Sequence, residues 1–360
     1  MIEVRLRLTP TGHYFLGGER GFAFDSKLER QMSDSYFISS LKVPTQTTLF
    51  GALRYIIGVK NEALRENSGE LIGNSSFDIT ADHETYGIIK RISPLYLCRE
   101  EGNDCEYFIR TPFDHKIAEY DSGAEQSIRT ANTYYTPMQI NADSGCRVIN
   151  YPGTETVKNY PSDYKAKDGI SKSYVSLSDR RIVEEDAVFV SSVEVVSRKS
   201  KNRYSSENGF AKKEYVRLNK GWSFVFFARL DADEIPEYNS TVLLGKDSSL
   251  FSVEITPEAE PDAAEFFKDR PASFHYCQSP VYVAGDVPQL IDRCSFSIIE
   301  NEYLRRFKTR NAKLAPEYDT PLLCLLSAGS VLYTDNIDQL RNNHAETAGF
   351  NKVIGGGTKK

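Results

Sequence analysis

One stretch of the sequence combines the residue types that bind single-stranded nucleic acid. Residues 198–220 hold eight basic residues against two acidic ones, and Tyr204, Phe210 and Tyr215 lie among them. Basic side chains neutralise phosphates and aromatic rings stack on unpaired bases, so this combination suits single-stranded RNA. An ordinary solvated loop is the alternative, since a charge run is often only a solvated face. The candidate RNA ligands are Arg198, Lys199, Lys201, Arg203, Lys212 and Lys213.

The rest of the charge pattern limits where RNA can lie. The chain carries a formal net charge of −6, and residues 231–265 hold ten acidic residues and one basic residue. This acidic segment repels phosphate and is expected to face away from RNA. A second basic cluster, at residues 305–313, either extends the basic surface or binds a protein partner.

No motif for catalysis accompanies the basic stretch. The five histidines are isolated, and none shows metal-ligand or nucleophile-pairing spacing. The glycines at 355–357 do not form a phosphate-binding loop, because no helix follows them. We therefore expect a protein that is not an enzyme and needs no metal or cofactor. The alternative is a metal-independent endoribonuclease that processes repeat RNA, with His13 or His83 as its acid–base residue.

Cysteine usage and hydropathy indicate the compartment. The six cysteines are scattered, with no CxxC pair, and are expected to be reduced and mostly buried. No segment approaches the roughly 20 apolar residues that cross a bilayer, and residues 1–5 do not resemble the start of a signal peptide. The sequence predicts a cytoplasmic protein with no membrane partner.

Periodic patterns predict the first elements. Residues 2–8 alternate apolar and charged side chains, as a half-buried strand does. A polar, glycine-containing loop is expected from residue 17 to 33. A helix is expected from residue 48 to 57, with Thr47 or Thr48 as its N-cap and Gly58 as its end.

Short aromatic and β-branched runs predict a sheet-rich remainder. The strands at 187–196 and 214–218 are expected to pair as a hairpin, which makes the basic stretch an RNA-contacting arm. Residues 151–173 have the composition of an exposed linker, so we place a domain boundary near residue 180. The predicted fold class is α+β. The other expected strands span residues 86–92, 106–110, 222–230, 250–255, 322–326 and 330–333, and short helices are expected at 262–268 and 336–343.

The order of several motifs resembles that of a known family. Together the motifs are similar to those of the third subunit of the Cmr (type III-B) CRISPR effector complex, within the RAMP superfamily. The resemblance covers residues 1–58, 186–255 and 322–355. The motifs are Pro44–Arg54 (PTQTTLFGALR), Gly209–Leu218 (GFAKKEYVRL), Leu243–Leu250 (LLGKDSSL), Ala328–Val331 (AGSV) and Gly349–Asn351 (GFN).

This resemblance implies both a fold and a role. The fold is two ferredoxin-like, RRM-like domains with long insertions, at residues 1–180 and 181–360, and a glycine-rich C-terminal loop. The role is a non-catalytic subunit that binds the 5′ repeat-derived tag of the guide RNA in antiviral defence. Its partners would be the large polymerase-like subunit and the backbone RAMP subunit. A protein scaffold that ignores RNA is a further alternative. Besides the arm, the tag-binding surface would include Arg20, Arg54, Lys352, Gly355 and Gly356.

Overall fold

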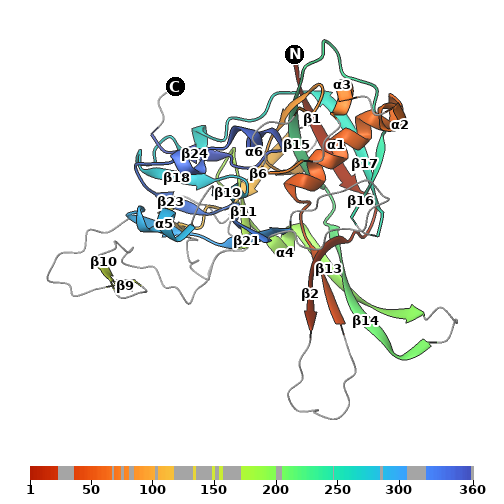
Figure 1. Ribbon diagram of the computed structural model, residues 1–360, viewed down its shortest axis with the longest axis horizontal. Coiled ribbons are helices and arrows are strands. Elements are labelled where there is room, and N and C mark those ends of the chain that lie inside the picture. The colour runs from red at the N-terminus through yellow and green to blue at the C-terminus, as the bar shows by residue number, and fades with distance from the viewer. Residues whose placement is uncertain are drawn as a thin grey trace.

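The computed structural model shows a sheet-rich body from which a group of long strands projects (Figure 1). The α+β class predicted from the sequence is confirmed, since short helices accompany many strands. The residues described are 1–22, 36–66, 69–73, 77–80, 85–101, 104–116, 133–134, 148–150, 154–156, 172–199, 205–245, 247–283, 287–305 and 322–357.

A nine-stranded antiparallel sheet forms the larger part of the body. The first strand, β1 (Ile2–Pro10), lies between β15 (Trp222–Leu230) and β17 (Ser249–Pro257). Strands from both sides of residue 180 therefore share one sheet, and a boundary at that residue does not separate them. The full order is β12 (Ile182–Glu184), β11 (Ser173–Ser176), β6 (Asp104–Arg110), β5 (Tyr96–Glu101), β15, β1, β17 and β16 (Thr241–Leu244), and β4 (Ile89–Ile92) also pairs with β15.

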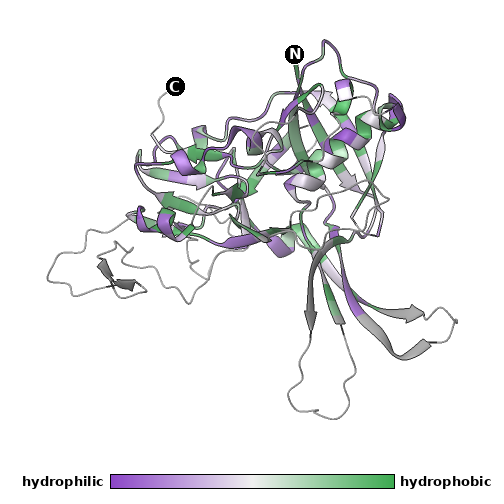
Figure 2. Cartoon of the chain, in the orientation of Figure 1, coloured by the Kyte–Doolittle hydropathy of each residue, from purple (hydrophilic) through white to green (hydrophobic). Residues whose placement is uncertain are grey.

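Helix α1 (Gln46–Lys60) covers one face of this sheet. Its buried residues, such as Leu49, Leu53 and Ile56, share one core with the inward side chains of β1. Burial of this apolar surface is the main force that holds the helix on the sheet. Figure 2 shows hydrophobic residues along the strands of the body and a mixture of hydrophobic and hydrophilic residues along α1.

Both ends of α1 differ from the sequence prediction. The N-cap is Thr45, whose hydroxyl accepts a hydrogen bond from the Thr48 amide at 3.3 Å. Gly58 lies inside the helix, and Asn61 caps it by donating to the Ile57 carbonyl at 2.9 Å. The helix is thus longer at both ends than the predicted span of residues 48–57.

A second, four-stranded sheet follows the order β-α-β-β-α-β along the chain. Its first strand, β18, lies between the third strand, β23, and the fourth, β24. The predicted helix at 336–343 is instead a 3₁₀ turn, η4 (Asp338–Leu340), followed by α6. The elements are β18 (Phe274–Cys277), α5 (Val287–Asp292), β20 (Phe296–Ile298), β23 (Val331–Tyr333), α6 (Asn343–Thr347) and β24 (Val353–Gly355).

Aromatic side chains join the two sheets. Tyr96 and Phe227 of the main sheet share a buried cluster with Phe267, Phe274 and Tyr276 near the second sheet. An ion pair between Asp114 and Arg270 is buried beside this cluster, and Tyr333 donates a hydrogen bond to Asp114 at 2.9 Å. The two sheets are therefore held by both apolar packing and a buried charge pair.

Smaller elements complete the described chain. A three-stranded sheet has the order β19 (Val281–Tyr282), β22 (Leu322–Leu326) and β21 (Asn301–Arg305). The predicted helix at 262–268 is only a 3₁₀ turn, η3 (Glu265–Phe267). Apart from the projecting strands, the remaining elements are α2 (Ala63–Glu66), α3 (Gly69–Ile72), α4 (Glu185–Val188) and the strand pairs β7 (His115–Lys116) with β8 (Thr133–Tyr134) and β9 (Val148–Asn150) with β10 (Thr154–Thr156).

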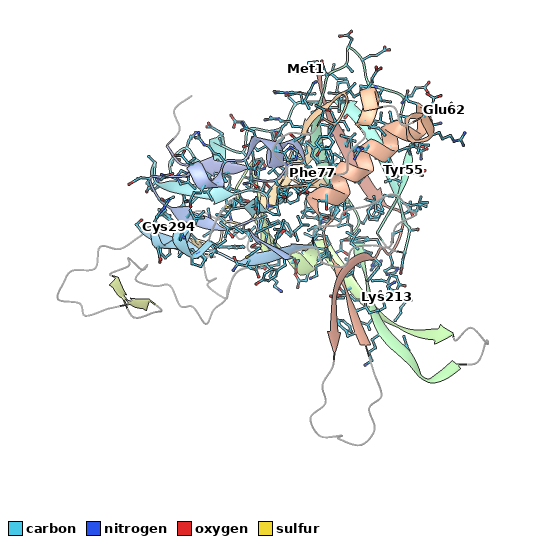
Figure 3. All side chains as sticks on the ribbon, in the orientation of Figure 1. Met1, Tyr55, Glu62, Phe77, Lys213 and Cys294 are labelled. Carbon is cyan, nitrogen blue, oxygen red and sulfur yellow. A yellow bond between two sulfur atoms is a disulfide. The ribbon has the colours of Figure 1, made fainter. Side chains whose placement is uncertain are left out.

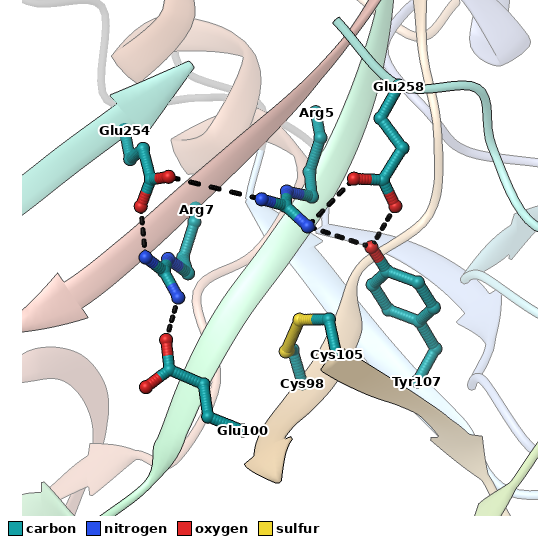
Figure 4. Close-up of a disulfide and its surroundings, with 8 residues drawn as sticks. All are labelled: Arg5, Arg7, Cys98, Glu100, Cys105, Tyr107, Glu254 and Glu258. Atoms are coloured by element: carbon teal, nitrogen blue, oxygen red, sulfur yellow. Dashed lines mark hydrogen bonds and ion pairs between the residues drawn. A yellow bond between two sulfur atoms is a disulfide. The ribbon is translucent and has the colours of Figure 1, made fainter. Parts of the chain in front are cut away.

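The expectation that the cysteines are reduced is wrong for one pair. Cys98 of β5 and Cys105 of β6 form a disulfide, with their Cα atoms 5.9 Å apart (Figure 4). The sequence did not reveal this pair, because the two residues meet only through the pairing of the β5–β6 hairpin. Cys277 and Cys294 are buried, as expected, and Cys324 is partly buried.

Candidate nucleic-acid interface

Four strands leave the body together and form what we call the arm. They are β2 (Leu16–Phe22), β3 (Tyr36–Leu41), β13 (Phe189–Lys199) and β14 (Ser205–Leu218), in the order β13-β14-β3-β2 (Figure 1). The predicted hairpin of the basic stretch is present, because β13 and β14 pair antiparallel along most of their length. A second hairpin, β2–β3, lies beside it, since β14 and β3 pair in parallel.

The β2 strand corrects one sequence prediction. Residues 17–22, which were expected to be a loop, belong to this strand. Arg20 is opposite Ile38 of β3, so its backbone lies within the arm. The pairing of β2 with β3 explains the difference, because glycines tolerate a strand when a neighbour supplies its hydrogen bonds.

Tyr14 fixes the base of the arm to the body. Its amide donates to the Val216 carbonyl at 2.7 Å, and the Val216 amide donates back to Tyr14 at 3.0 Å. The Tyr14 hydroxyl donates to the Lys42 carbonyl at 2.6 Å. Burial raises the pKa of Tyr14 well above its usual value, so the hydroxyl stays protonated and keeps this bond.

Lys213 is held at the same base by three groups. The ammonium forms an ion pair with Asp247, and it lies 3.8 Å from the ring centroid of Phe15 and 5.0 Å from that of Tyr215. Lys213 is only 9% exposed, and Figure 3 places it where the arm meets the body. An RNA phosphate would have to displace these contacts, so Lys213 acts first as an anchor of the arm.

The neighbouring Lys212 is placed differently. Its side chain is exposed, and no described residue forms an ion pair with it. Successive residues of a strand point to opposite faces, which explains why Lys213 is buried and Lys212 is not. Lys212 is therefore the basic candidate of this arm whose side chain is both described and accessible.

The other basic candidates of the arm are only partly defined. The backbones of Arg198 and Lys199 lie at the end of β13. Lys201 and Arg203 fall outside the described residues. The assignment of all four residues as RNA ligands stays a prediction.

Arg54 has partners within the fold. Its Nε donates to the Ile72 carbonyl at 2.7 Å, and one terminal nitrogen donates to the Gly73 carbonyl at 2.8 Å. The guanidinium also lies 5.8 Å from the ring centroid of Tyr86. These bonds satisfy the carbonyl end of α3, so Arg54 stabilises the body, and its contact with RNA stays a prediction.

The C-terminal candidates lie far from the arm. Gly355 belongs to β24 and is opposite His275 of β18, on the far side of the body from the arm (Figure 1). A Cβ atom at Gly356 would lie 2.3 Å from the Pro271 carbonyl oxygen, so close packing requires glycine there. Lys352 lines a small pocket together with Arg91 and Glu260. The structure does not bring these residues together with Lys212.

The described histidines show no acid–base pair that solvent can reach. His115 Nδ1 lies 3.3 Å from an Asp114 carboxylate oxygen, but both side chains are buried. His13 is exposed and has no hydrogen bond or ion pair to another described residue, and His83 lies outside the described residues. His115 and His275 are buried, and burial lowers the pKa of each. His344 Nε2 lies 2.9 Å from the Asp78 carbonyl oxygen.

The described part of the chain contains neither a metal-ligand cluster nor a helix of membrane-spanning character. No group of three or more His, Cys, Asp or Glu residues there is arranged to hold a metal ion. No helix within those ranges is both long and apolar enough to span a membrane.

Comparison with known proteins decides the family. The family model described as CRISPR-associated protein (Cas_Cmr3) matches residues 6–268, which include the second half of β1, all of α1 and the whole arm. The chain belongs to this family. The Cas_Cmr3 match confirms the coarse part of the sequence prediction, a type III CRISPR effector subunit of the Cmr3 kind. No curated protein sequence matches the chain.

Solved structures show the same fold. A chain in the cryo-EM structure of the type III-B Cmr-beta complex bound to cognate target RNA has a TM-score of 0.53 and 13% identity, covering 98% of this chain and 96% of that one. A chain in the same complex bound to target RNA and AMPPnP has a TM-score of 0.51 and 12% identity, covering 97% and 95%. These likenesses extend over the whole Cas_Cmr3 chain.

The sequence did not identify Phe37 and Phe15 as residues of the candidate site. Phe37 is 36% exposed on β3, and Phe15 packs against Lys213. Both residues are apolar and lie in short strand-like runs, which predict burial rather than a role in a site. Only the strand register shows that Phe37 shares a row with Lys212.

Proposed function

We propose that this Cas_Cmr3 chain is a non-catalytic, cytoplasmic subunit of a type III CRISPR effector that binds the 5′ repeat-derived tag of the guide RNA. Its proposed partners are the large polymerase-like subunit and the backbone RAMP subunit, in antiviral defence. Family membership supports the effector role. The similar Cmr-beta chains come from complexes bound to target RNA, which also favours an RNA-facing subunit.

The observation that carries RNA binding is the arm. It projects from the body and contains the most basic stretch of the chain, and Lys212 stands exposed on it. A projecting sheet with a net positive charge attracts the phosphates of a strand that lies alongside it. The acidic segment 231–265 lies on β16, β17 and the turns around them, and its Asp247 pairs with Lys213 at the base of the arm.

The strand order of the second sheet also supports an RNA-binding role. The second sheet has the β-α-β-β-α-β order of a ferredoxin-like fold, with the first strand between the third and fourth. We propose that it is one of two ferredoxin-like domains and that the other is built on β1 and α1. RRM domains use a four-stranded sheet of this kind to bind RNA.

A non-catalytic role is proposed because of how the histidines are placed. General acid–base cleavage needs two groups within hydrogen-bond reach of the scissile phosphate. His13 is solvent-exposed without such a neighbour among the described residues, and the buried histidines cannot reach a bound strand. No observation on the described residues therefore favours the endoribonuclease alternative, and its second candidate, His83, lies outside them.

A gel-shift and cleavage assay tests the proposal. End-labelled RNA carrying a repeat-derived 5′ tag is incubated with the full chain in EDTA and then in Mg²⁺, beside an RNA of equal length with a scrambled tag. We expect intact RNA in both conditions and tighter binding of the tagged RNA. A discrete cleavage product would refute the non-catalytic role, and equal binding of both RNAs would refute tag recognition. No binding of either RNA would refute RNA binding by this subunit and leave the protein-scaffold alternative.

A further inference from the structure

A row of exposed side chains crosses one face of the arm. Val195 of β13 pairs with Lys212 of β14, and Lys212 pairs with Phe37 of β3. Paired residues of neighbouring strands point to the same face, so these three side chains stand side by side. Val195 is 66% exposed and Phe37 is 36% exposed. Val193, two residues before Val195, adds a further exposed side chain to the same face.

The next strand leaves room beside the aromatic ring. The register puts Gly21 of β2 opposite Phe37, and glycine has no side chain that can cover the ring. The ring of Phe37 is thus bordered by a cation on one side and by a bare backbone position on the other. An exposed ring beside a bare position is accessible to a flat ligand.

At the base of the arm, the face that carries Lys213 differs from the face that carries the exposed row. There, Lys213 is covered by Phe15 and paired with Asp247. On the exposed face, Glu214 is the residue nearest the body, and its carboxylate accepts a hydrogen bond from the Ser40 amide at 3.2 Å. The acid limits the exposed row on the side of the body, so an anionic ligand would lie from Lys212 outward along the arm.

Single-stranded RNA is the occupant that fits this row best. An aromatic ring on an exposed sheet stacks on a base of any sequence, and a neighbouring cation pairs with the adjoining phosphate. The eight basic and two acidic residues at 198–220 give the arm the opposite charge to RNA. A stable protein interface buries about 800 Å² on each partner and is depleted of charged residues at its core, which a row with the exposed Lys212 at its centre does not match.

We propose that this face of the arm is a stacking platform for one unpaired nucleotide, with Phe37 against the base and Lys212 against a phosphate. The proposal rests on the RNA-binding function proposed above and adds the residues that carry it. Val195, opposite Lys212, supplies apolar contact for the sugar or the edge of the base, whereas Val193 lies beside Glu214 on the side of the body. Phe37 is a contact that the charge pattern of the sequence did not reveal.

Fluorescence of 2-aminopurine tests the stacking. The full chain is titrated with short unstructured RNAs, each with 2-aminopurine at one position, and binding is followed by anisotropy of an end label. In one of these RNAs, the fluorescence of 2-aminopurine should be quenched on binding. Phe37→Ala should remove the quench and weaken binding about tenfold, the size expected for loss of one base–aromatic stack. Phe37→Tyr should keep both.

Two further variants separate charge from stacking. Lys212→Ala should lower the slope of log affinity against log salt by about 0.7, as expected for one phosphate contact with a single strand. Tyr55→Ala is the matched control, because Tyr55 is a similarly exposed aromatic residue, 43% exposed, that lies on α1 of the body (Figure 3). This control should bind RNA like the unchanged chain. Circular dichroism of each variant confirms that the fold is retained.

The outcomes distinguish this inference from the proposed function. RNA binding that is equally tight in Phe37→Ala and Lys212→Ala would overturn the platform and leave the function standing. Failure of the unchanged chain to bind any RNA would overturn both. Loss of a partner subunit on Val195→Asp, with RNA binding intact, would assign the face to a protein and overturn the platform.

Discussion

Basic residues are paired within the body, whereas Lys212 is exposed on one face of the arm. In the body, Arg54 bonds to two carbonyls and Arg270 pairs with a buried aspartate. On the arm, Lys212 is exposed beside two apolar side chains and has no described ion pair. The comparison teaches that residue type alone does not identify an RNA ligand, because a basic residue already paired in the fold costs energy to release.

The strongest test of this comparison removes a charge from the body. Asp114→Ala leaves the buried Arg270 without its carboxylate and removes the acceptor of the Tyr333 hydroxyl. We expect a loss of about 3–5 kcal/mol in the free energy of unfolding, measured by urea denaturation. Arg229→Ala, which breaks an exposed pair with Glu3, is the control and should cost no more than about 1 kcal/mol. Equal losses of unfolding free energy in the two variants would contradict a stabilising role of the buried Asp114 ion pair.

Glu302 is an exception to the paired charges of the body, because the charge close to it has the same sign. Burial and the nearby Glu300 raise the pKa of Glu302 to about 7 from 4.5. The native state then holds the proton more tightly than the unfolded state, so the stability from this group is lost as pH rises from about 4.5 to 7. Glu302→Gln should therefore stabilise the chain by about 1–2 kcal/mol at pH 8 and have little effect at pH 5. A pH-independent effect in thermal unfolding would refute this.

Lys213 and Lys212 sharpen the comparison within two adjacent residues. Lys213→Met should cost about 1 kcal/mol in unfolding free energy, because the ammonium leaves Asp247 and the rings at the base of the arm. Lys212→Met should change stability by less than about 0.5 kcal/mol, as for most surface substitutions. Denaturation of the two variants side by side gives the difference. A larger loss from Lys212→Met would reverse the assignment of the two lysines.

The smallest expected effect lies at the start of α1. Thr45→Ala removes the hydroxyl that accepts from the Thr48 amide and should cost about 1 kcal/mol. Thr47→Ala should cost less, since no Thr47 side-chain bond to a helix amide is present. Thermal unfolding of both variants would identify the cap, and a larger effect at Thr47 would restore the sequence prediction.

Local patterns predicted the strands well. The continuous apolar run of Trp222–Leu230 gave a strand with the same limits as β15, and the alternation at residues 2–8 gave β1. The cap of α1 was missed because Thr45, Thr47 and Thr48 all have the same capping chemistry. Gly58 was misread as a helix end, and the structure shows why glycine stands there: a Cβ would lie 3.1 Å from both Ile72 and Leu64.

The candidate site depended on contacts that the sequence pattern does not encode. The basic stretch and its hairpin were predicted, since they are local. The parallel pairing of β14 with β3 joins residues about 175 positions apart, and no periodicity reveals such a pairing. The position of Phe37 beside Lys212 follows only from that pairing, and the burial of Lys213 follows from its distant partners Phe15 and Asp247.

The position of β1 has a consequence for how the chain is made. This strand is synthesised long before its two neighbours in the sheet, β15 and β17, which begin at Trp222 and Ser249. During translation β1 therefore emerges with both edges unpaired, and closing such long loops slows folding. Open apolar strand edges invite aggregation. A ribosome-bound chain that stops before residue 222 should depend on chaperones, and the completed subunit should not.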